Sequence, residues 1–273
     1  MWRCSMVKAG VAGAAGRMGQ RIVHAIAENT GLQLVAALDA HGHEALGQDA
    51  GSRAGLPPVG VPICADLSGV LDAVDVLMDF SHHEASMTHL RQAVVQKKAV
   101  VIGTTGFTPQ EWDEIRRIGP STRCLVSANM SVGVNVVWRI LEDVARTLGD
   151  DYDVEIVEAH HRRKADAPSG TALKMGEILA KALGRDLRDV GVFARHGQIG
   201  PRSDREIGIQ TVRAGDIVGE HTVIFAGVGE RIEIIHRAHS RDNFARGAVR
   251  AALWLVNQPA GLYDMQDVLG MKK

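Results

Sequence analysis

The segment Val7-Lys-Ala-Gly-Val-Ala-Gly13-Ala-Ala-Gly16-Arg-Met-Gly19 decides the fold. A short apolar run, residues 7–12, ends in a glycine-rich turn, and an amphipathic stretch carrying Met18, Ile22 and Ile26 follows it. This order predicts a strand, a tight turn and a helix whose first N–H groups and positive dipole end hold a pyrophosphate. We therefore expect the chain to begin with a dinucleotide-binding unit.

The glycine pattern is imperfect, because Ala15 stands where the common fingerprint has its middle glycine. Asp39 supports the prediction, since it follows the next apolar run, residues 32–38, and lies twenty residues beyond Gly19. A carboxylate at that place accepts hydrogen bonds from the adenosine ribose. In the alternative interpretation the glycines only allow close packing of strand and helix, and Asp39 caps a loop.

Short apolar runs and amphipathic stretches alternate up to about residue 129, which is typical of a Rossmann-type α/β unit with a parallel sheet. Further strands are expected at residues 74–80, 98–103 and 123–127, and a long loop at 42–62. Helices are expected from Ser81 towards Gln96, from the Thr108 capping box with its following proline, and over residues 132–148.

The pattern changes near residue 153 to longer, strand-rich segments, which predicts a second, α+β domain with a mixed sheet. Its strands are expected at residues 153–159, 206–213, 221–226 and 231–239, with a hairpin turn at 227–229 and a helix over 169–183. A helix over 243–256 returns to the first domain. We therefore expect a dinucleotide-binding domain of residues 1–130 with 241–273, and a substrate-binding domain of residues 131–240.

Length and composition agree with two globular domains, since the chain has 273 residues and domains average about 150 residues. A net charge of -1 with 45% hydrophobic residues excludes a disordered chain and argues against a nucleic-acid binder, so a small molecule is the expected partner. Cys4, Cys64 and Cys124 form neither a disulfide framework nor a zinc spacing, which favours a reducing cytoplasm. We identify no export signal and no membrane segment.

The most informative stretch is Glu158-Ala-His160-His161-Arg-Arg-Lys164-Ala-Asp-Ala-Pro-Ser169-Gly170-Thr171-Ala172. It begins as a strand and ends as the first turn of a helix, where N–H groups without a helical partner hold a carboxylate. Just before that turn, His160, His161 and Lys164 supply groups that exchange protons or carry positive charge. The stretch therefore predicts acid–base chemistry beside a carboxylate-binding site.

Two other interpretations of this stretch remain open. His-His-Arg-Arg-Lys also has the composition of a solvated basic surface or a nucleic-acid patch, although the net charge and the lack of interleaved aromatic residues weigh against both. A metal site on His160 and His161 is disfavoured, because neighbouring side chains of a strand point to opposite faces and no zinc-ligand spacing is present.

The stretch 158–172 resembles the signature of the 4-hydroxy-tetrahydrodipicolinate reductase family, and the resemblance extends over nearly the whole chain. It includes residues 13–19, 103–107, 127–135, 212–222 and 247–250. Such a resemblance implies reduction of a cyclic imine dicarboxylate with NADH or NADPH on the route to diaminopimelate and lysine. It also implies a homotetramer assembled through the sheet of the second domain. Because the cofactor motifs lie in the first domain and the proton donors in the second, we expect catalysis to require closure of the domains.

Site residues follow from the same resemblance. Those implied to bind the cofactor are Gly13, Ala14, Ala15, Gly16, Arg17, Met18, Asp39, Gly103, Thr104, Thr105, Ser127, Ala128, Asn129 and Met130. His160 and Lys164 are implied to be catalytic, as acid–base group and proton donor, and no metal is implied. Those implied to contact the substrate are His161, Ser169, Gly170, Thr171 and Arg241.

Cofactor choice is where the chain departs from the family, because members that use NADPH well have arginine after the acidic residue, and here Asp39 is followed by Ala40. We expect NADH to be used at least as well as NADPH, with Arg17, His41 and His43 compensating in part. Two other functions remain: a related nicotinamide oxidoreductase acting on another small acid, and a non-catalytic dinucleotide sensor.

Overall fold

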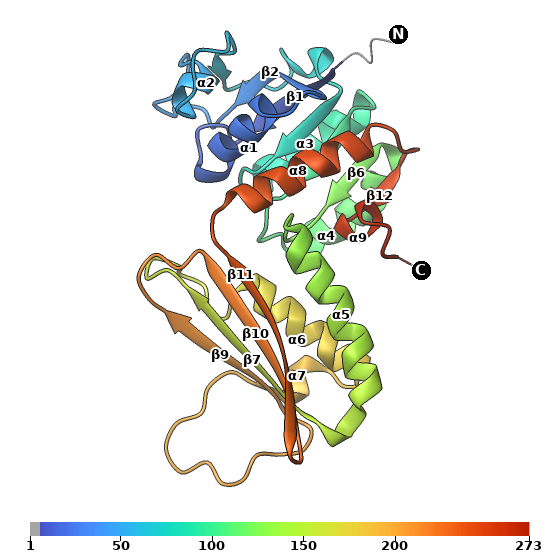
Figure 1. The fold of residues 1–273 in the computed structure, drawn as a ribbon. Coiled ribbons are helices and arrows are strands. Elements are labelled where there is room, and N and C mark those ends of the chain that lie inside the picture. Colours follow the sequence, from blue (N-terminus) through green and yellow to red (C-terminus); the bar gives the residue numbers. More distant parts are fainter. Residues whose placement is uncertain (1–5, 273) are drawn as a thin grey trace. The chain divides into compact units, whose positions relative to one another are not determined.

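The computed structural model describes residues 6–272, so Cys4 and the start of the chain lie outside the described residues (Figure 1). The chain divides into two compact units. The first unit runs to Val132 and includes the chain from Arg241 onwards, and the second is Gly133–Ser240. Across residues 6–272, no helix has the length and apolar character needed to cross a membrane.

Within the described residues of the first unit, seven parallel strands form one sheet in the order β12-β6-β5-β4-β1-β2-β3. The strands are β1 (Val7–Ala12), β2 (Leu32–Leu38), β3 (Ile63–Cys64), β4 (Val76–Asp79), β5 (Ala99–Ile102), β6 (Arg123–Val126) and β12 (Gly261–Tyr263). Every residue of β4 and β5 is buried, as expected for central strands covered on both faces. The predicted Rossmann-type fold is confirmed.

Helices cover both faces of this sheet. The helices that share one hydrophobic core are α1 (Arg17–Ala27), α2 (Ala50–Arg53), α8 (Asp242–Leu255) and α9 (Met265–Val268). Those that pack into the core on the other face are α3 (His83–Val95) and α4 (Pro109–Ile118). Helix α8 packs beside α1, and the chain from Arg241 onwards belongs to the first unit (Figure 1).

Two local predictions for the first unit differ in outcome. The Thr108 capping box is confirmed, since Thr108 Oγ1 accepts the Glu111 N–H and Glu111 accepts the Thr108 N–H. Ser81 does not cap α3, where His82 holds the N-cap position. The Ser81 hydroxyl instead donates to Asp79 Oδ1 at 2.6 Å, because an ionised carboxylate is the stronger acceptor. The expected loop at 42–62 contains the short helix α2.

The second unit, described over its whole length, has a mixed five-stranded sheet in the order β11-β10-β7-β9-β8. The strands are β7 (Asp153–His160), β8 (Gly191–Val192), β9 (Ile207–Arg213), β10 (Gly219–Gly227) and β11 (Glu230–Ala238). The helices are α5 (Val132–Leu148), α6 (Gly170–Ala182) and α7 (Leu187–Val190). Strands β11, β10 and β7 are antiparallel, whereas β9 runs parallel to β7, so the predicted mixed sheet is confirmed.

Helices α5 and α6 pack on one face of this sheet. Val212 and Ile235 lie on the other face, because Ile209 of β9 and Val223 of β10 face the helices and the side chains of a strand alternate. Val212 is 44% and Ile235 42% exposed. Both are therefore exposed apolar side chains on the face opposite the helices.

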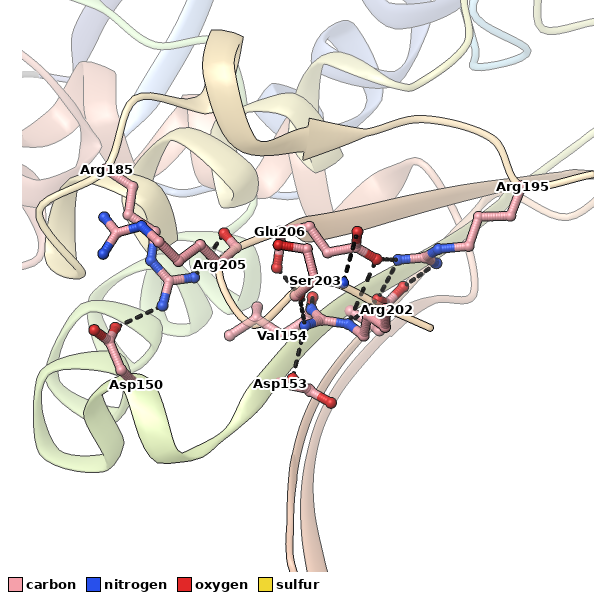
Figure 2. A network of polar contacts seen from close by, with 10 residues as sticks. Asp150, Asp153, Val154, Arg185, Arg195, Arg202, Ser203, Arg205 and Glu206 are labelled. Carbon is pink, nitrogen blue, oxygen red and sulfur yellow. Dashed lines mark hydrogen bonds and ion pairs between the residues drawn. The ribbon is translucent and has the colours of Figure 1, made fainter. Parts of the chain in front are cut away.

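The segment between β8 and β9 is fastened to the sheet by arginines (Figure 2). Arg195 Nη2 donates to Glu155 Oε1 at 2.6 Å and Arg195 Nη1 to Glu155 Oε2 at 2.8 Å. Arg202 donates to Asp153 at 2.6 Å and to the carbonyl of Glu206 at 2.6 Å. These side-chain bonds hold the segment against β7 in place of backbone hydrogen bonds of a helix or strand.

Among residues 6–272, Cys64 and Cys124 are free thiols. Burial raises the pKa of the Cys124 thiol to about 12, so this group is an inert part of the core.

Candidate active site

The glycine turn has the geometry that its sequence requires. Gly13 has a φ of +76°, and a Cβ there would lie 2.5 Å from the Phe80 carbonyl oxygen. A Cβ on Gly19 would lie 2.0 Å from the Gly13 carbonyl oxygen. Gly16, at the N-cap of α1, has no side chain to accept from the first turn, so N–H groups there remain for an anion. The turn fits a pyrophosphate.

Asp39 lies at the end of β2 and holds this turn. Its Oδ2 accepts the Ala15 N–H at 2.8 Å, and its Oδ1 accepts the Ala40 N–H at 2.9 Å. A carboxylate has about four acceptor sites, so two remain for ribose hydroxyls. Arg17 is exposed at the first position of α1. His43 Nδ1 accepts the Ala45 N–H at 3.1 Å, which commits that nitrogen to the loop.

Residues 103–105 and 127–130 follow the adjacent parallel strands β5 and β6, at the sheet edge where such folds bind ligands. The Phe80 ring packs against Gly103, where a Cβ would lie 2.1 Å from a ring carbon. Thr104 is buried and its Oγ1 accepts the Ser86 hydroxyl at 2.8 Å. The Ser127 hydroxyl donates to the Asn129 carbonyl at 2.9 Å. Both loops therefore have a defined shape.

Met130 is buried where the last of these loops turns into α5. A Cβ on Gly247 of α8 would lie 1.9 Å from the Met130 carbonyl oxygen, so only glycine lets this helix approach the loop. Met18 is half-buried at the start of α1, and Thr105 and Ala128 are exposed.

Asp79, which the sequence interpretation missed, is buried at the end of β4 and connects the loop of residues 103–105 to α3. Its carboxylate accepts the Ser81 N–H at 3.0 Å and lies 2.7 Å from His89 Nδ1. Thr104 Oγ1 lies 3.4 Å from Asp79 Oδ1. The signal in the sequence is an aspartate that directly ends a buried apolar strand.

The second unit holds the His-His-Lys stretch. Val154, Ile156, Glu158 and His160 occupy the buried face of β7, while His161 is half-buried beyond the strand end. The two histidines are therefore in different environments. Across residues 6–272, no cluster of three His, Cys, Asp or Glu side chains is arranged to hold a metal ion.

Glu158 is a fully buried carboxylate surrounded by donors, and the sequence interpretation gave it no catalytic role. Arg213 binds it with two nitrogens, each at 2.8 Å, and the Ser169 N–H donates to Oε1 at 2.9 Å. His160 Nδ1 lies 2.6 Å from Oε2. Burial alone would raise the pKa of Glu158, but the bonds from His160, Arg213 and Ser169 outweigh it and hold that pKa well below its usual range. Glu158 is therefore ionised.

Lys164 lies on the turn after β7, where its Nζ is 2.9 Å from Asp166 Oδ1 and its N–H donates to the His161 carbonyl at 3.1 Å. Ser169 caps α6, since its Oγ accepts the Ala172 N–H at 3.2 Å. Ser169 is buried and its polar groups are engaged within the protein, whereas Gly170 is exposed and Thr171 half-buried. The exposed part of the predicted carboxylate site is therefore the Gly170–Thr171 turn.

His221 of β10 lies behind Ser169, with 3.1 Å between His221 Nε2 and Ser169 Oγ. Its ring centre is 5.3 Å from that of His160. Burial, together with the charge of His160, lowers the pKa of His221 to about 3, so this imidazole is neutral at physiological pH. Arg241 is half-buried directly before α8 and belongs to the first unit.

Two models of protein families together match nearly all of the chain. "Dihydrodipicolinate reductase, N-terminus" matches residues 7–130, and "Dihydrodipicolinate reductase, C-terminus" matches residues 133–269. The chain belongs to the dihydrodipicolinate reductase family. It is therefore an oxidoreductase of this family, with a dinucleotide-binding unit, as the resemblance in sequence implied.

Individual members of the dihydrodipicolinate reductase family support the assignment. Proteins named 4-hydroxy-tetrahydrodipicolinate reductase from Syntrophobacter fumaroxidans and Geobacter metallireducens are 56% and 57% identical to the chain, over 98% of it and 100% of their own length. The structure titled "Dipicolinate bound Dihydrodipicolinate reductase from Paenisporosarcina sp. TG-14" superposes with a TM-score of 0.73 at 26% identity, covering 96% of this chain and 98% of that one. A myo-inositol dehydrogenase from Corynebacterium glutamicum, at 14% identity and a TM-score of 0.59, covers 97% of this chain and 93% of its own and shares the fold alone.

Proposed function

We propose that the protein reduces 4-hydroxy-tetrahydrodipicolinate to tetrahydrodipicolinate with NADH or NADPH, in diaminopimelate and lysine biosynthesis. The observation that carries this proposal is the arrangement of the ionised Glu158, His160 and the Gly170–Thr171 turn in a member of this family. A related enzyme for another small acid and a non-catalytic sensor are both disfavoured, because the acid–base stretch is complete, with His160 and Lys164 both present.

The chemistry of the substrate explains the residue types. Two ring carboxylates flank the ring nitrogen, and we propose that His161 and the Gly170–Thr171 turn bind and orient them, with Arg241 as a further contact. Orientation of this kind contributes a large part of catalysis. A bound reduced nicotinamide supplies the hydride that the ring accepts at C4.

Proton movements are assigned to two side chains of the second unit. The C4 hydroxyl of the substrate takes a proton from the site and leaves as water, the neighbouring ring carbon C5 gives a proton back to the site, and a conjugated imine with a C4=C5 double bond remains. We assign this acid–base exchange to His160 Nε2, since its Nδ1 lies against Glu158. After hydride addition at C4, the electron-rich ring carbon takes a proton from the Lys164 ammonium group.

For cofactor choice, we propose that NADH is used at least as well as NADPH. Asp39 offers acceptors to free ribose hydroxyls and repels a phosphate, and Ala40 supplies no cation in the next position. A charge-assisted hydrogen bond contributes about 1.5–3 kcal/mol, so its absence lowers NADPH affinity on the order of 10- to 100-fold. Because His43 Nδ1 accepts a hydrogen bond from the Ala45 N–H, we expect His43 to offset less of the loss in NADPH affinity.

We propose that the second unit is the substrate-binding domain and assembles a homotetramer through its sheet. Val212 and Ile235 support this assignment, because both are exposed apolar side chains on the face opposite the helices. Light scattering of the purified protein, with Val212→Lys and Ile235→Lys variants, measures the assembly. A monomer at micromolar concentration in the unmodified protein contradicts it.

Turnover is the direct test of the proposed activity. Purified protein is mixed with NADH and the freshly made condensation product of pyruvate and aspartate semialdehyde, and loss of cofactor absorbance is followed. We expect turnover that needs both components and is inhibited by pyridine-2,6-dicarboxylate. Binding of NADH without turnover would support the sensor, and turnover only with another small acid would support the related enzyme.

A further inference from the structure

We infer that Glu158 is a positioning residue, whose single carboxylate fixes the His160 ring and the first turn of α6 in one geometry. This inference rests on the proposed function of His160 as acid–base group and of the Gly170–Thr171 turn as carboxylate site. It adds a residue that touches neither substrate nor cofactor, yet sets where both substrate-contacting elements stand.

The buried location of the Glu158 carboxylate costs free energy, so it needs an explanation. It occupies the central strand β7 and is fully buried, next in line after Val154 and Ile156 on the face that packs against α6. Taking a carboxylate out of water costs several kcal/mol, and a buried ion pair often stabilises a fold no better than apolar side chains of the same volume. Stability alone therefore does not explain a glutamate at this position.

The bonds of Glu158 explain it better. Oε2 meets His160 Nδ1 at 2.6 Å, while Oε1 accepts the Ser169 N–H at 2.9 Å, directly before the Gly170–Thr171 turn. Arg213 binds both oxygens and also donates to the Asp166 carbonyl at 2.7 Å, on the loop that carries Lys164. One carboxylate thus connects the acid–base group, the carboxylate-binding turn and the loop of the proton donor.

The bond to Glu158 also selects the tautomer of His160. An ionised carboxylate only accepts hydrogen bonds, so His160 Nδ1 carries a hydrogen and Nε2 is the nitrogen left for proton exchange. On the neighbouring strand, a Cβ on Gly219 would lie 3.0 Å from His160 Nε2. Glycine at 219 therefore gives the ring room to stay in this orientation.

The test begins with Glu158→Gln, which keeps the shape of the side chain but removes its charge. The new amide N–H groups then face the N–H donors of His160, Arg213 and Ser169. We expect kcat to fall about 100-fold, as for a small misplacement of reacting groups, and KM for the substrate to rise, while the Kd for NADH stays unchanged. Glu158→Asp keeps an acceptor-only group and is expected to recover part of the lost kcat. A kcat for Glu158→Gln within about twofold of the unmodified protein overturns the inference.

A double-mutant cycle with His160→Gln separates positioning from general damage. If Glu158 affects kcat through His160, adding Glu158→Gln to His160→Gln lowers kcat little further, because that ring is already absent, while KM still rises because the Gly170–Thr171 turn has lost the Ser169 contact. Losses in kcat that multiply independently overturn the inference. If His160→Gln alone keeps the unmodified kcat, the proposed role of His160 fails instead, so the two failures are distinguishable.

Glu155→Gln is the matched control, since Glu155 lies on the same strand and also binds an arginine, Arg195, with two nitrogens at 2.6 and 2.8 Å. Arg195 belongs to the network that fastens the β8–β9 segment (Figure 2). We expect Glu155→Gln to lower the melting temperature and leave kcat within about twofold. Equal losses of kcat and of melting temperature in the two variants would make Glu158 a structural ion pair and overturn the inference.

Discussion

Asp39 Oδ2 accepts the N–H of Ala15 at 2.8 Å, which joins the end of β2 to the middle of the glycine turn. The residue proposed to hold the adenosine ribose therefore also shapes the turn proposed to hold the pyrophosphate. Changes at Asp39 disturb both, whereas a change of the adjacent, exposed Ala40 side chain leaves the bond between Asp39 and Ala15 in place.

Ala40→Arg is expected to shift cofactor preference towards NADPH. The guanidinium supplies the missing partner for the 2′-phosphate, and the ratio of kcat/KM for NADPH to that for NADH is expected to rise about 10- to 100-fold. Initial rates with each cofactor at moderate salt measure this ratio, and Ala40→Gln controls for side-chain size. A strong NADPH preference in the unmodified protein would show that other residues form the phosphate site.

Lys164→Ala and His161→Ala are expected to differ in kinetics. A proton donor acts in the transition state, so loss of Lys164 lowers kcat by about 100-fold or more with a smaller change in KM. A carboxylate contact also acts in the ground state, so loss of His161 raises KM at least as much as it lowers kcat. Lys174→Ala, a change of an exposed lysine on α6, is the control. Near-unmodified kinetics for Lys164→Ala would remove that residue from the mechanism.

Asp79→Ala is expected to destabilise the first unit and weaken cofactor binding. The change leaves the half-buried His89 and Ser81 N–H without their acceptor, which costs about 1–3 kcal/mol, and it releases the loop that carries Thr104. Thermal unfolding and NADH titration measure the two effects. Asp75→Ala removes one exposed hydrogen bond from Lys8 and is the control. An unchanged Kd for NADH in a destabilised Asp79→Ala protein would show that Asp79 acts on stability alone.

Stability is expected to fall with acid because His221 is buried as a neutral imidazole. Burial lowers its pKa from 6.5 to about 3, so below pH 6.5 the unfolded chain binds a proton that the folded protein does not. The contribution is fully present above about pH 6.5 and is lost progressively as the pH falls towards 3, by a few kcal/mol in all. The free energy of unfolding, measured in denaturant across this range, checks it.

His221→Gln separates this contribution from other titrating groups. Glu158, whose pKa is also lowered on folding, contributes a loss only below its ordinary pKa of 4.5, so the interval from pH 6.5 to 4.5 reports the histidines. In the variant, the slope of the free energy of unfolding against pH is expected to flatten over that interval. The slope that remains is assigned to His236, whose pKa is also lowered by burial. An unchanged slope would contradict the prediction.

The parts of the fold that local sequence determines were predictable. Strands β1 and β2 and helix α5 have the predicted bounds, because runs of apolar residues with a single polar residue mark the strands and a regular helical period marks the helix. Strands β3, β8 and β12 have two or three residues, too few to show a period, and they form only because a longer neighbour offers them an edge. The Ser81 cap failed because Asp79 captured its hydroxyl.

The same division holds for the site. The glycine turn was predictable because a Cβ on its glycines would clash with backbone atoms of the turn itself and of the neighbouring strand end. Glu158 and Arg213 are 55 residues apart and meet across the neighbouring strands β7 and β9, so no local motif connects them. One signal was present: Glu158 falls on the buried face of a strand, where an unpaired carboxylate is not tolerated.

The order in which the units lie along the chain has a consequence for biosynthesis. Ala248, Ala252 and Leu255 of α8 cover part of one face of the first sheet, and the ribosome makes α8 only after the entire second unit. A nascent chain that has reached Ser240 contains all of the second unit but still exposes the part of the first sheet that α8 will cover. The second unit can therefore complete its fold on the ribosome before the first unit does. The apolar surface that chaperones would have to cover lies on the first unit, although most of that unit was synthesised earlier.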